Sequence, residues 1–281
     1  MNIYFCIAER TYCYFKDYVF SINNKLNAII LKYDEQLENQ EKKILSILND
    51  NIVIILHRIP NYLIEINNIN FKNLFFLNTE QTSSPEHLDY IKNFIHKKFH
   101  IIDYSKENID ILNNNNIHNI IYFPYIYNQN EFLNINKTNN ICTLKPKICS
   151  PYRKTIVSNI KQHNIDINLI SGWNKRRDKV LFSHKILLNL SFENDRKIFE
   201  TIRCNRCLFN KMIIISDKKY NSDLIDYSKH IIFVDSVDLP NKIKDVIDNY
   251  EKYYKLLDLD NIDIHINDDL INVDILLKYT K

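Results

Sequence analysis

The chain has 281 residues, 45% hydrophobic and 25% charged, a composition typical of folded globular proteins. Its 37 basic and 34 acidic side chains give a net charge of only +3, and no long basic block occurs, so we do not expect it to bind nucleic acid. No stretch approaches the roughly 18 uncharged apolar residues of a transmembrane helix, and the N-terminus lacks the pattern of a signal peptide.

Six cysteines occur in this chain without an export signal, so we expect free thiols and a cytoplasmic location. Asn, Ile, Lys and Tyr are abundant, which suggests an A/T-rich source such as a large virus and therefore a host cytoplasm. Cys204 and Cys207 have the C-x-x-C spacing that forms half of a zinc site. No second close pair of Cys or His accompanies them, and this spacing also places two side chains on one face of a helix. We therefore expect core packing, with neither a metal nor a cofactor.

In the first half of the chain, short apolar runs alternate with longer helical patterns, which indicates βαβ units around a mostly parallel sheet. The expected strands are residues 1–7, 51–56, 73–77, 100–103 and 119–123, and the expected helices are 18–31, 35–48 and 85–98. Ser84 and Pro85 predict the start of the last helix, because serine is a common N-cap and proline is favoured at the first helical position.

Residues 128–140 are polar, rich in asparagine and without periodicity, which is typical of a linker. The alternation then restarts, with strands expected at 142–149, 168–170, 185–190, 212–216 and 230–234 and helices at 153–162, 194–209 and 240–257. The predicted fold is α/β, with an N-terminal domain at 1–127, a linker at 128–140, a second domain at 141–237 and a helical C-terminal segment at 238–281.

Polar residues follow the expected strand at 185–190, where Asn189 and Ser191 precede a polar loop and a helix. In open α/β sheets, ligands bind beyond the carboxyl ends of the strands, where helix N-termini present N–H groups to phosphate. Glu200, in the first turns of that helix, could accept hydrogen bonds from both hydroxyls of a ribose. Its alternative role is a favourable interaction of the carboxylate with the helix N-terminus.

Arg176 and Arg177 fall in the loop after Gly172, the single glycine of the chain. A guanidinium fork suits the oxygens of a diphosphate better than a lysine does. The alternative is a solvated loop surface without a ligand.

Four segments of this half resemble the donor domain of GT-B glycosyltransferases, in particular a branch found in bacteria and giant viruses. They are the Gly-containing loop GWNKRRD at 172–178, KILLN at 185–189, FETIR at 199–203 and ISD at 215–217. The resemblance implies that Glu200 holds the ribose of the donor nucleotide and that Arg176 or Arg177 contacts its diphosphate.

Three segments of the first half are similar to the acceptor domain of the same branch: NTEQ at 78–81, DYSKEN at 103–108 and FPY at 123–125. All the segments follow the order of the family. The resemblance implies two Rossmann-like domains that face each other across a cleft, the first binding the acceptor and the second the nucleotide-sugar. In the first donor-domain loop, where the family tends to have Gly-Ser, this chain has SPYR at 150–153.

Glu80 follows a strand that is expected to end at the cleft, and its carboxylate could deprotonate an acceptor hydroxyl. The alternative is a carboxylate that orients a neighbouring loop. The expected nucleotide-sugar-binding residues are Arg153, Arg176, Arg177, Asn189, Ser191, Glu200 and Arg203. The Asp-x-Asp pair at 258–260 lies in the C-terminal helical region and not at a strand end, so a metal-dependent site is disfavoured.

The sequence therefore predicts a glycosyltransferase that moves a sugar from a nucleotide-sugar to a hydroxyl of a glycan, a protein or a small-molecule acceptor, without a metal. Two alternatives remain open. One is a non-catalytic nucleotide- or sugar-binding protein that retains the fold, and the other is an enzyme that modifies a nucleotide-sugar, such as an epimerase.

Overall fold

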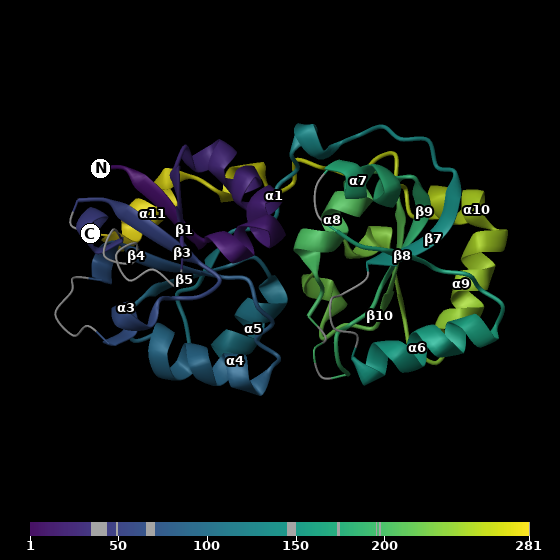
Figure 1. Ribbon diagram of the computed structural model, residues 1–281, viewed down its shortest axis with the longest axis horizontal. Coiled ribbons are helices and arrows are strands. Elements are labelled where there is room, and N and C mark those ends of the chain that lie inside the picture. The colour runs from purple at the N-terminus through teal and green to yellow at the C-terminus, as the bar shows by residue number, and fades with distance from the viewer. Residues whose placement is uncertain are drawn as a thin grey trace. The chain divides into compact units, whose positions relative to one another are not determined.

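The computed structural model describes residues 1–34, 44–48, 50–65, 71–144, 150–172, 175–194, 196 and 198–280. The chain forms two compact units, shown in Figure 1. The first unit contains Met1–Ile126 and His265–Lys281, and the second contains Tyr127–Ile264. Among the described helices, none is long and apolar enough to cross a bilayer.

The first unit is built on a parallel sheet with the strand order β2-β1-β3-β4-β5-β6. Its strands are β1 (Ile3–Ala8), β2 (Ile29–Tyr33), β3 (Ile52–Leu56), β4 (Leu74–Asn78), β5 (His100–Asp103) and β6 (Ile121–Tyr122). Its helices include α1 (Glu9–Leu26), α3 (Asn61–Glu65), α4 (Pro85–Tyr90), α5 (Lys106–Asn114) and α11 (Val273–Thr280). Every position of β3 and β4 is buried, as expected of parallel strands that are covered on both faces.

Helix α1 is the main difference from the expected elements of this unit, because it begins at Glu9 and ends at Leu26 where a helix at 18–31 was predicted. Asn27 ends it by taking the left-handed conformation with φ 50°, which asparagine tolerates better than most residues. The apolar residues that follow pair with β1 as strand β2. Most of the helix predicted at 35–48 lies outside the described residues.

Helix α4 precedes strand β5 in the chain, and helix α5 follows it. Helix α4 begins at Pro85 as predicted, with Ser84 at the N-cap position but without a hydrogen bond from its side chain, and the chain continues as a π-helical turn at Ile91–Ile95. Helix α5 was not predicted, since its sequence is rich in asparagine. It is capped by Ser105, whose hydroxyl accepts a hydrogen bond from the backbone N–H of Asn108 at 3.3 Å.

The second unit is built on a parallel sheet with the strand order β11-β10-β9-β7-β8. Its strands are β7 (Asn139–Leu144), β8 (Asn168–Ile170), β9 (His184–Asn189), β10 (Ile213–Asp217) and β11 (Ile231–Val234). Its helices include α6 (Pro151–Gln162), α7 (Lys175–Phe182), α8 (Thr201–Phe209), α9 (Leu239–Asp248) and α10 (Tyr250–Leu256). Helix α7 lies where a loop was expected, and α8 begins later than the predicted position 194.

The polar segment predicted as a linker packs on the second unit. The backbone N–H of Leu133 donates a hydrogen bond to Asn210 Oδ1 at 3.0 Å, and the carboxylate of Glu131 pairs with Arg206 at 2.7 Å. Strand β7 already begins at Asn139. This segment therefore contacts α8 and the residue that follows it, while about every second residue from 130 to 140 is exposed.

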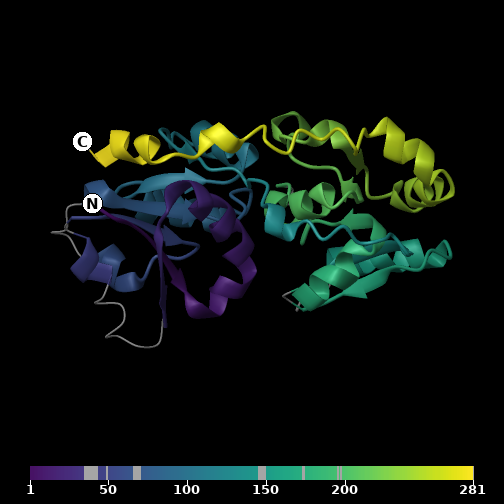
Figure 2. The ribbon, with the colours of Figure 1, turned by 90° about the horizontal axis from the view of Figure 1, so that it is seen from above.

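The C-terminal segment is shared between the two units. Helices α9 and α10, separated at Asn249, belong to the second unit, whereas residues from His265 onward belong to the first. Figure 2 shows this tail in yellow along the first unit. The side chain of Leu276 is fully buried, and the ring of Tyr279 lies 5.3 Å from that of His100.

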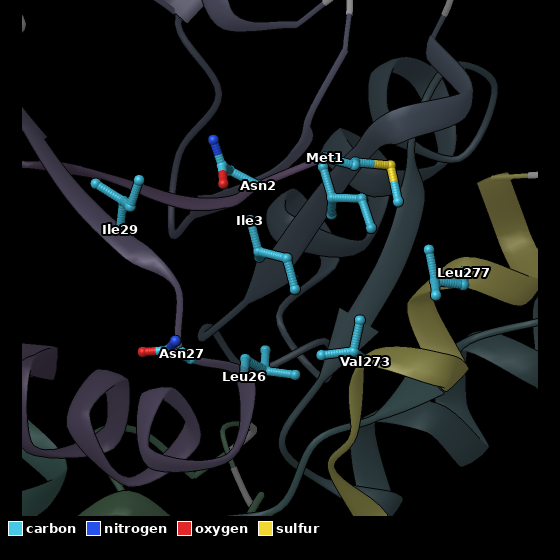
Figure 3. A pocket seen from close by; sticks show the side chains of 9 residues that line it. Met1, Asn2, Ile3, Leu26, Asn27, Ile29, Val273 and Leu277 are labelled. Atoms are coloured by element: carbon cyan, nitrogen blue, oxygen red, sulfur yellow. The ribbon is translucent and has the colours of Figure 1, made fainter.

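A cavity of about 330 Å³ lies at the amino edge of the first sheet. Figure 3 shows its lining, which includes Ile3 from β1, Leu26 from α1, and Val273 and Leu277 from α11. The tail therefore forms one wall of this cavity, at the edge of the sheet opposite to the loops at the carboxyl ends of the strands.

We predict that Leu276→Ala lowers the free energy of unfolding of the first unit by about 2–5 kcal/mol, because it removes a fully buried side chain and leaves a cavity. Amide hydrogen exchange of β1 and β3, followed by mass spectrometry, measures this unit separately. Leu270→Ala, at a 39% exposed position of the same tail, is the matched control and should cost far less. Equal exchange rates in the Leu276 variant and the wild type would contradict the packing of the tail on this sheet.

Candidate functional site

The strand order of the second unit places a topological switch point between β7 and β9, since the chain continues to opposite sides of the sheet from these two strands. Ligands of open α/β sheets bind at the carboxyl ends of the strands at such a point. Here helix α6 begins after its N-cap Ser150, and the loop after β9 leads to α8.

Arg153 holds the loop that follows β9. Its Nε donates to the carbonyl oxygens of Leu190 at 3.1 Å and Ser191 at 3.0 Å, and its Nη2 donates to Leu190 at 2.7 Å. The hydroxyl of Ser150 donates to the carbonyl of Phe192 in the same loop. Arg153 is only 7% exposed. Its guanidinium therefore connects helix α6, on one side of the switch point, to the loop after β9, on the other.

A second buried charged group at this edge of the sheet is the carboxylate of Asp217, at the end of β10. Asp217 accepts hydrogen bonds from the backbone N–H of Ser191 at 3.1 and 3.0 Å, from Lys219 Nζ at 2.6 Å and from the hydroxyl of Tyr152 at 3.2 Å. Lys219 also donates to Ser191 Oγ at 2.9 Å. Partial burial and the neighbouring charge of Asp217 raise the pKa of Tyr152, so its hydroxyl stays protonated as a donor.

Glu200 stands at the N-cap position of α8, and its carboxylate lies between two guanidinium groups. Its Oε2 is 2.5 Å from Arg203 Nη1, and its Oε1 is 3.6 Å from Arg153 Nη2. The side chain of Glu200 is 19% exposed and that of Arg203 is 31% exposed, so both reach the surface of this edge. Glu200 makes no capping hydrogen bond to a backbone N–H of α8, and its carboxylate instead pairs with Arg203 of that helix.

Asn189 ends β9 and is buried. Its Nδ2 donates to the hydroxyl of Ser216 at 3.1 Å, whereas its Oδ1 has no hydrogen-bond partner among the described residues. A buried amide oxygen without a partner is costly, so this position can accept a hydrogen bond from a donor that is not part of the described chain.

Arg177 lies in the first turn of α7 and is engaged by its neighbour. Its Nε donates to Asp178 Oδ1 at 2.7 Å, and Asp178 Oδ2 accepts from Arg206 at 3.0 Å. Arg206 in turn pairs with Glu131 at 2.7 Å. The side chain of Arg177 is 8% exposed, whereas Arg176 is exposed. The structure therefore brings Arg153, Asn189, Ser191, Glu200 and Arg203 together and places Arg177 in a separate chain of ion pairs.

Cys204 and Cys207 are both buried on α8. Burial raises the pKa of Cys207 to about 11 and holds the pKa of Cys204 well above its ordinary value, so both thiols are protonated at neutral pH. No group of three or more His, Cys, Asp or Glu side chains in the described part of the chain could hold a metal ion.

In the first unit, Glu80 follows β4 at the carboxyl edge of the sheet, and its side chain is 46% exposed. Its Oε1 lies 3.5 Å from Nδ1 of His57, and that nitrogen is 2.9 Å from Thr79 Oγ1. Burial and the positive charges of Arg58, His87 and Arg10 lower the pKa of His57 to about 4. A neutral imidazole therefore stands beside the carboxylate of Glu80 at neutral pH.

His57 has an uncommon backbone conformation, with φ 75°. Left-handed backbone at a residue other than glycine is costly, and such positions cluster at functional sites. The turn directs the side chain across the end of β4, where the ring also packs 5.2 Å from that of Phe15.

The backbone of Glu80 is fixed by a buried polar network. Asn78 Oδ1 accepts from the N–H of Glu80 at 3.1 Å, and the Nδ2 groups of Asn78 and Asn108 donate to its carbonyl at 3.0 and 2.9 Å. Both amides also donate to the carboxylate of Asp103, at 2.6 and 3.1 Å. Burial raises the pKa of Asp103 to about 7, against the lowering effect of these donors.

Several residues of these two edges carried no functional assignment from the sequence. Four of them lie within the segments that resemble the family, but no role was predicted for them: Asn78, Asp103, Asn108 and Asp217. His57 and Lys219 carried no sequence signal, since their partners come from other strands or from a turn that no motif predicts.

No family model matches this sequence. The chain is similar to uncharacterized proteins of Acanthamoeba polyphaga mimivirus. One is 32% identical over 241 residues, covering 79% of this chain and 26% of that protein, and a second is 32% identical over 185 residues, covering 63% and 25%. A third is 29% identical over 233 residues, covering 79% and 72%. The match thus spans about a quarter of the length of the first two relatives.

Among solved structures, the chain is similar to HepE of Anabaena in complex with UDP, with a TM-score of 0.60, 10% identity, and coverage of 99% of this chain and 98% of that one. It is also similar to a TarM variant of S. aureus in complex with fondaparinux, alpha-GlcNAc-glycerol and UDP, with a TM-score of 0.58, 13% identity, and coverage of 85% and 57%. These similarities confirm the predicted fold class, two parallel-sheet α/β domains of the GT-B type.

Proposed function

We propose that this protein is a glycosyltransferase that moves a sugar from a nucleotide-sugar to a hydroxyl of a glycan, a protein or a small-molecule acceptor, without a metal. The second unit binds the donor and the first unit binds the acceptor. The viral relatives and the free cysteines support a cytoplasmic setting, that of the host if the source is a virus.

The observation that carries this proposal is the position of Glu200 at the carboxyl edge of the second sheet. Its carboxylate is partly exposed and is held by Arg153 and Arg203, beside the switch point where this class of sheet binds ligands. Two ribose hydroxyls can donate to the two oxygens of such a carboxylate. The similarity of the fold to HepE, whose structure contains UDP, supports a nucleotide as the ligand.

Positive charge for the diphosphate comes from this edge without a metal ion. Arg203 is partly exposed beside Glu200, and Arg176 is exposed in the first turn of α7. Helix α6 begins at the switch point, and the N-terminal end of its dipole favours an anion. These groups stabilise the charge that develops on the departing nucleotide.

On the acceptor side, Glu80 acts as the general base that takes the proton of the attacking hydroxyl. Its carboxylate is exposed enough to meet a substrate, and its backbone is fixed by Asn78 and Asn108. A positioned carboxylate of this kind accelerates proton transfer by about 10²–10⁴-fold.

One observation favours the second candidate, a non-catalytic nucleotide-binding protein. The charge of Glu200 is already balanced by two arginines, and Arg177 is occupied by Asp178. Such a site can bind a nucleotide while offering the leaving group less positive charge, since of the arginines predicted to bind it only Arg176 is exposed and Arg203 is partly so. The two candidates share the binding step and differ in whether a sugar is transferred.

We predict that Glu200→Ala weakens the affinity for UDP or for the corresponding GDP ligand, whichever binds, by about a hundredfold to ten-thousandfold. The carboxylate loses two charge-assisted hydrogen bonds of about 1.5–3 kcal/mol each, and each 1.4 kcal/mol is worth a factor of about ten. Glu200→Gln should have a milder effect, because the amide keeps one acceptor. Isothermal titration calorimetry measures the affinities.

The melting temperature distinguishes a ligand-binding role of Glu200 from a structural one. It should change little in either variant, because Arg153 keeps its hydrogen bonds to the loop after β9. Glu251→Ala, at an exposed position of the same unit, is the matched control and should alter neither quantity. Unchanged affinity together with a lowered melting temperature would mean that Glu200 only stabilises the start of α8.

We also predict that the protein transfers sugar in the presence of excess EDTA. A panel of UDP-, GDP-, ADP- and CMP-sugars is incubated with p-nitrophenyl glycosides and with glycerol as acceptors, and the products are followed by mass spectrometry. At least one pair should give a glycosylated acceptor and a free nucleotide at an unchanged rate with EDTA. Loss of product with EDTA and its recovery with Mg²⁺ or Mn²⁺ would contradict metal independence. Binding without any transfer would favour the non-catalytic candidate.

A further inference from the structure

We propose that Asp103 is a positioning residue for the reaction, which places Glu80 through the side-chain amides of Asn78 and Asn108. This inference rests on the proposed function, in which Glu80 is the general base. It assigns a role to two segments, at 78–81 and 103–108, that the sequence marked without explaining.

The first step is that both backbone polar groups of Glu80 are held by side chains. Asn78 uses its Oδ1 for the N–H of Glu80 and its Nδ2 for the carbonyl, at 3.1 and 3.0 Å. Asn108 donates to the same carbonyl at 2.9 Å. Because these groups would otherwise bond to water or to neighbouring loops, the position of the Glu80 backbone depends on the orientation of two amides.

The second step is that Asp103 sets the orientation of both amides. In its ionised form the carboxylate of Asp103 only accepts, and the NH₂ group of each asparagine faces it. Asp103 Oδ2 accepts from Asn78 at 2.6 Å, and Oδ1 accepts from Asn108 at 3.1 Å. With the NH₂ groups fixed, the oxygen of Asn78 faces the N–H of Glu80, and that of Asn108 faces the N–H and hydroxyl of Thr82, both at 2.9 Å.

The third step is that the centre of the network is buried, although Asn78 Oδ1 also contacts Nε2 of the half-buried His87 at 2.8 Å. Asp103 and both asparagines are fully buried, whereas the side chain of Glu80 is 46% exposed. A buried carboxylate is costly unless its hydrogen bonds are complete, so its presence in the interior needs a reason beyond packing. The network ends at the backbone N–H and carbonyl of Glu80, whose carboxylate lies 3.5 Å from Nδ1 of His57.

A double-mutant cycle tests this inference. The variants are Asp103→Asn, Glu80→Gln and the double variant, measured with the donor and acceptor pair that gives the fastest transfer in the panel above. Asp103→Asn should lower kcat by about 10–100-fold, since a displacement of about 1 Å in a catalytic group can cost this much. The KM for the acceptor should change less than about twofold, because a positioning role acts on the chemical step and leaves ground-state binding in place. In the Glu80→Gln background the same substitution should have no further effect on kcat, because the group that it positions is already inactive.

Two controls separate positioning from loss of the fold. The affinity for the nucleotide, which binds in the second unit, and the melting temperature are measured for every variant. Asp110→Asn makes the same chemical change on the surface of α5 and should leave kcat and both of these quantities unchanged. Because the loss of stability caused by Asp103→Asn is the same in both backgrounds, a purely structural effect would lower kcat equally in each.

The outcomes distinguish this inference from the function on which it rests. An equal loss of kcat from Asp103→Asn in the wild-type and in the Glu80→Gln background would overturn the positioning role while leaving Glu80 as the base. Full activity of Glu80→Gln would remove the general base from the proposed function and this inference with it. Full activity of Asp103→Asn with Glu80 in place would overturn the positioning role alone.

Discussion

A buried aspartate at the end of a parallel strand organises the carboxyl edge of each unit. Asp103 ends β5 in the first unit and accepts hydrogen bonds from Asn78 at the end of β4 and from the N–H of Ser105. Asp217 ends β10 in the second unit and accepts from the N–H of Ser191, in the loop after β9. The loops of an α/β sheet carry N–H groups that have no partner in the ladder, and a carboxylate satisfies several of them at once. The positions of Glu80 and of the segment that leads to Glu200 depend on these two interactions.

The charges of the second unit divide into those that build the site and those that can meet a ligand. Arg153 and Lys219 are buried and bonded to backbone or to Asp217, so they keep the loops in place. Glu200 and Arg203 are partly exposed and can exchange their mutual contact for contacts with a nucleotide. This division explains how a site with few glycines can still be rigid, because side chains supply the constraints that tight backbone turns would otherwise provide.

Much of the fold could be predicted from the sequence, because continuous apolar runs such as IVIIL in β3 and LFFLN in β4 can hardly form anything but buried strands. The elements that were missed depend on single residues or distant contacts. Strand β2 follows Asn27, whose left-handed conformation ends α1, and the tail joins the first unit through a buried Leu276 and the contact of Tyr279 with His100, which is remote in sequence. Neither feature leaves a periodic signal.

Residues of the candidate site could be predicted from the sequence where their place at the end of a strand is enough to put them at the edge of the sheet. Asn189, Ser191 and Glu200 follow β9, and such residues gather at one edge of a parallel sheet. Arg177 shows the limit of that argument. Either Arg176 or Arg177 was expected to contact a diphosphate, and this stays a prediction. The guanidinium of Arg177 pairs with Asp178, which belongs to a chain of ion pairs with Arg206 and Glu131. A sequence names charged residues without stating which of them neutralise each other.

We propose that a nucleotide binds at the carboxyl edge of the second sheet, between the start of α6 and Glu200. A crystal structure of the protein with UDP tests it most directly. We expect the ribose hydroxyls within hydrogen-bond distance of the carboxylate of Glu200 and the diphosphate near the N-terminus of α6 or Arg203. Well-ordered UDP at the edge of the first sheet beside Glu80, or UDP that leaves Glu200 bonded only to Arg153 and Arg203, would contradict this account.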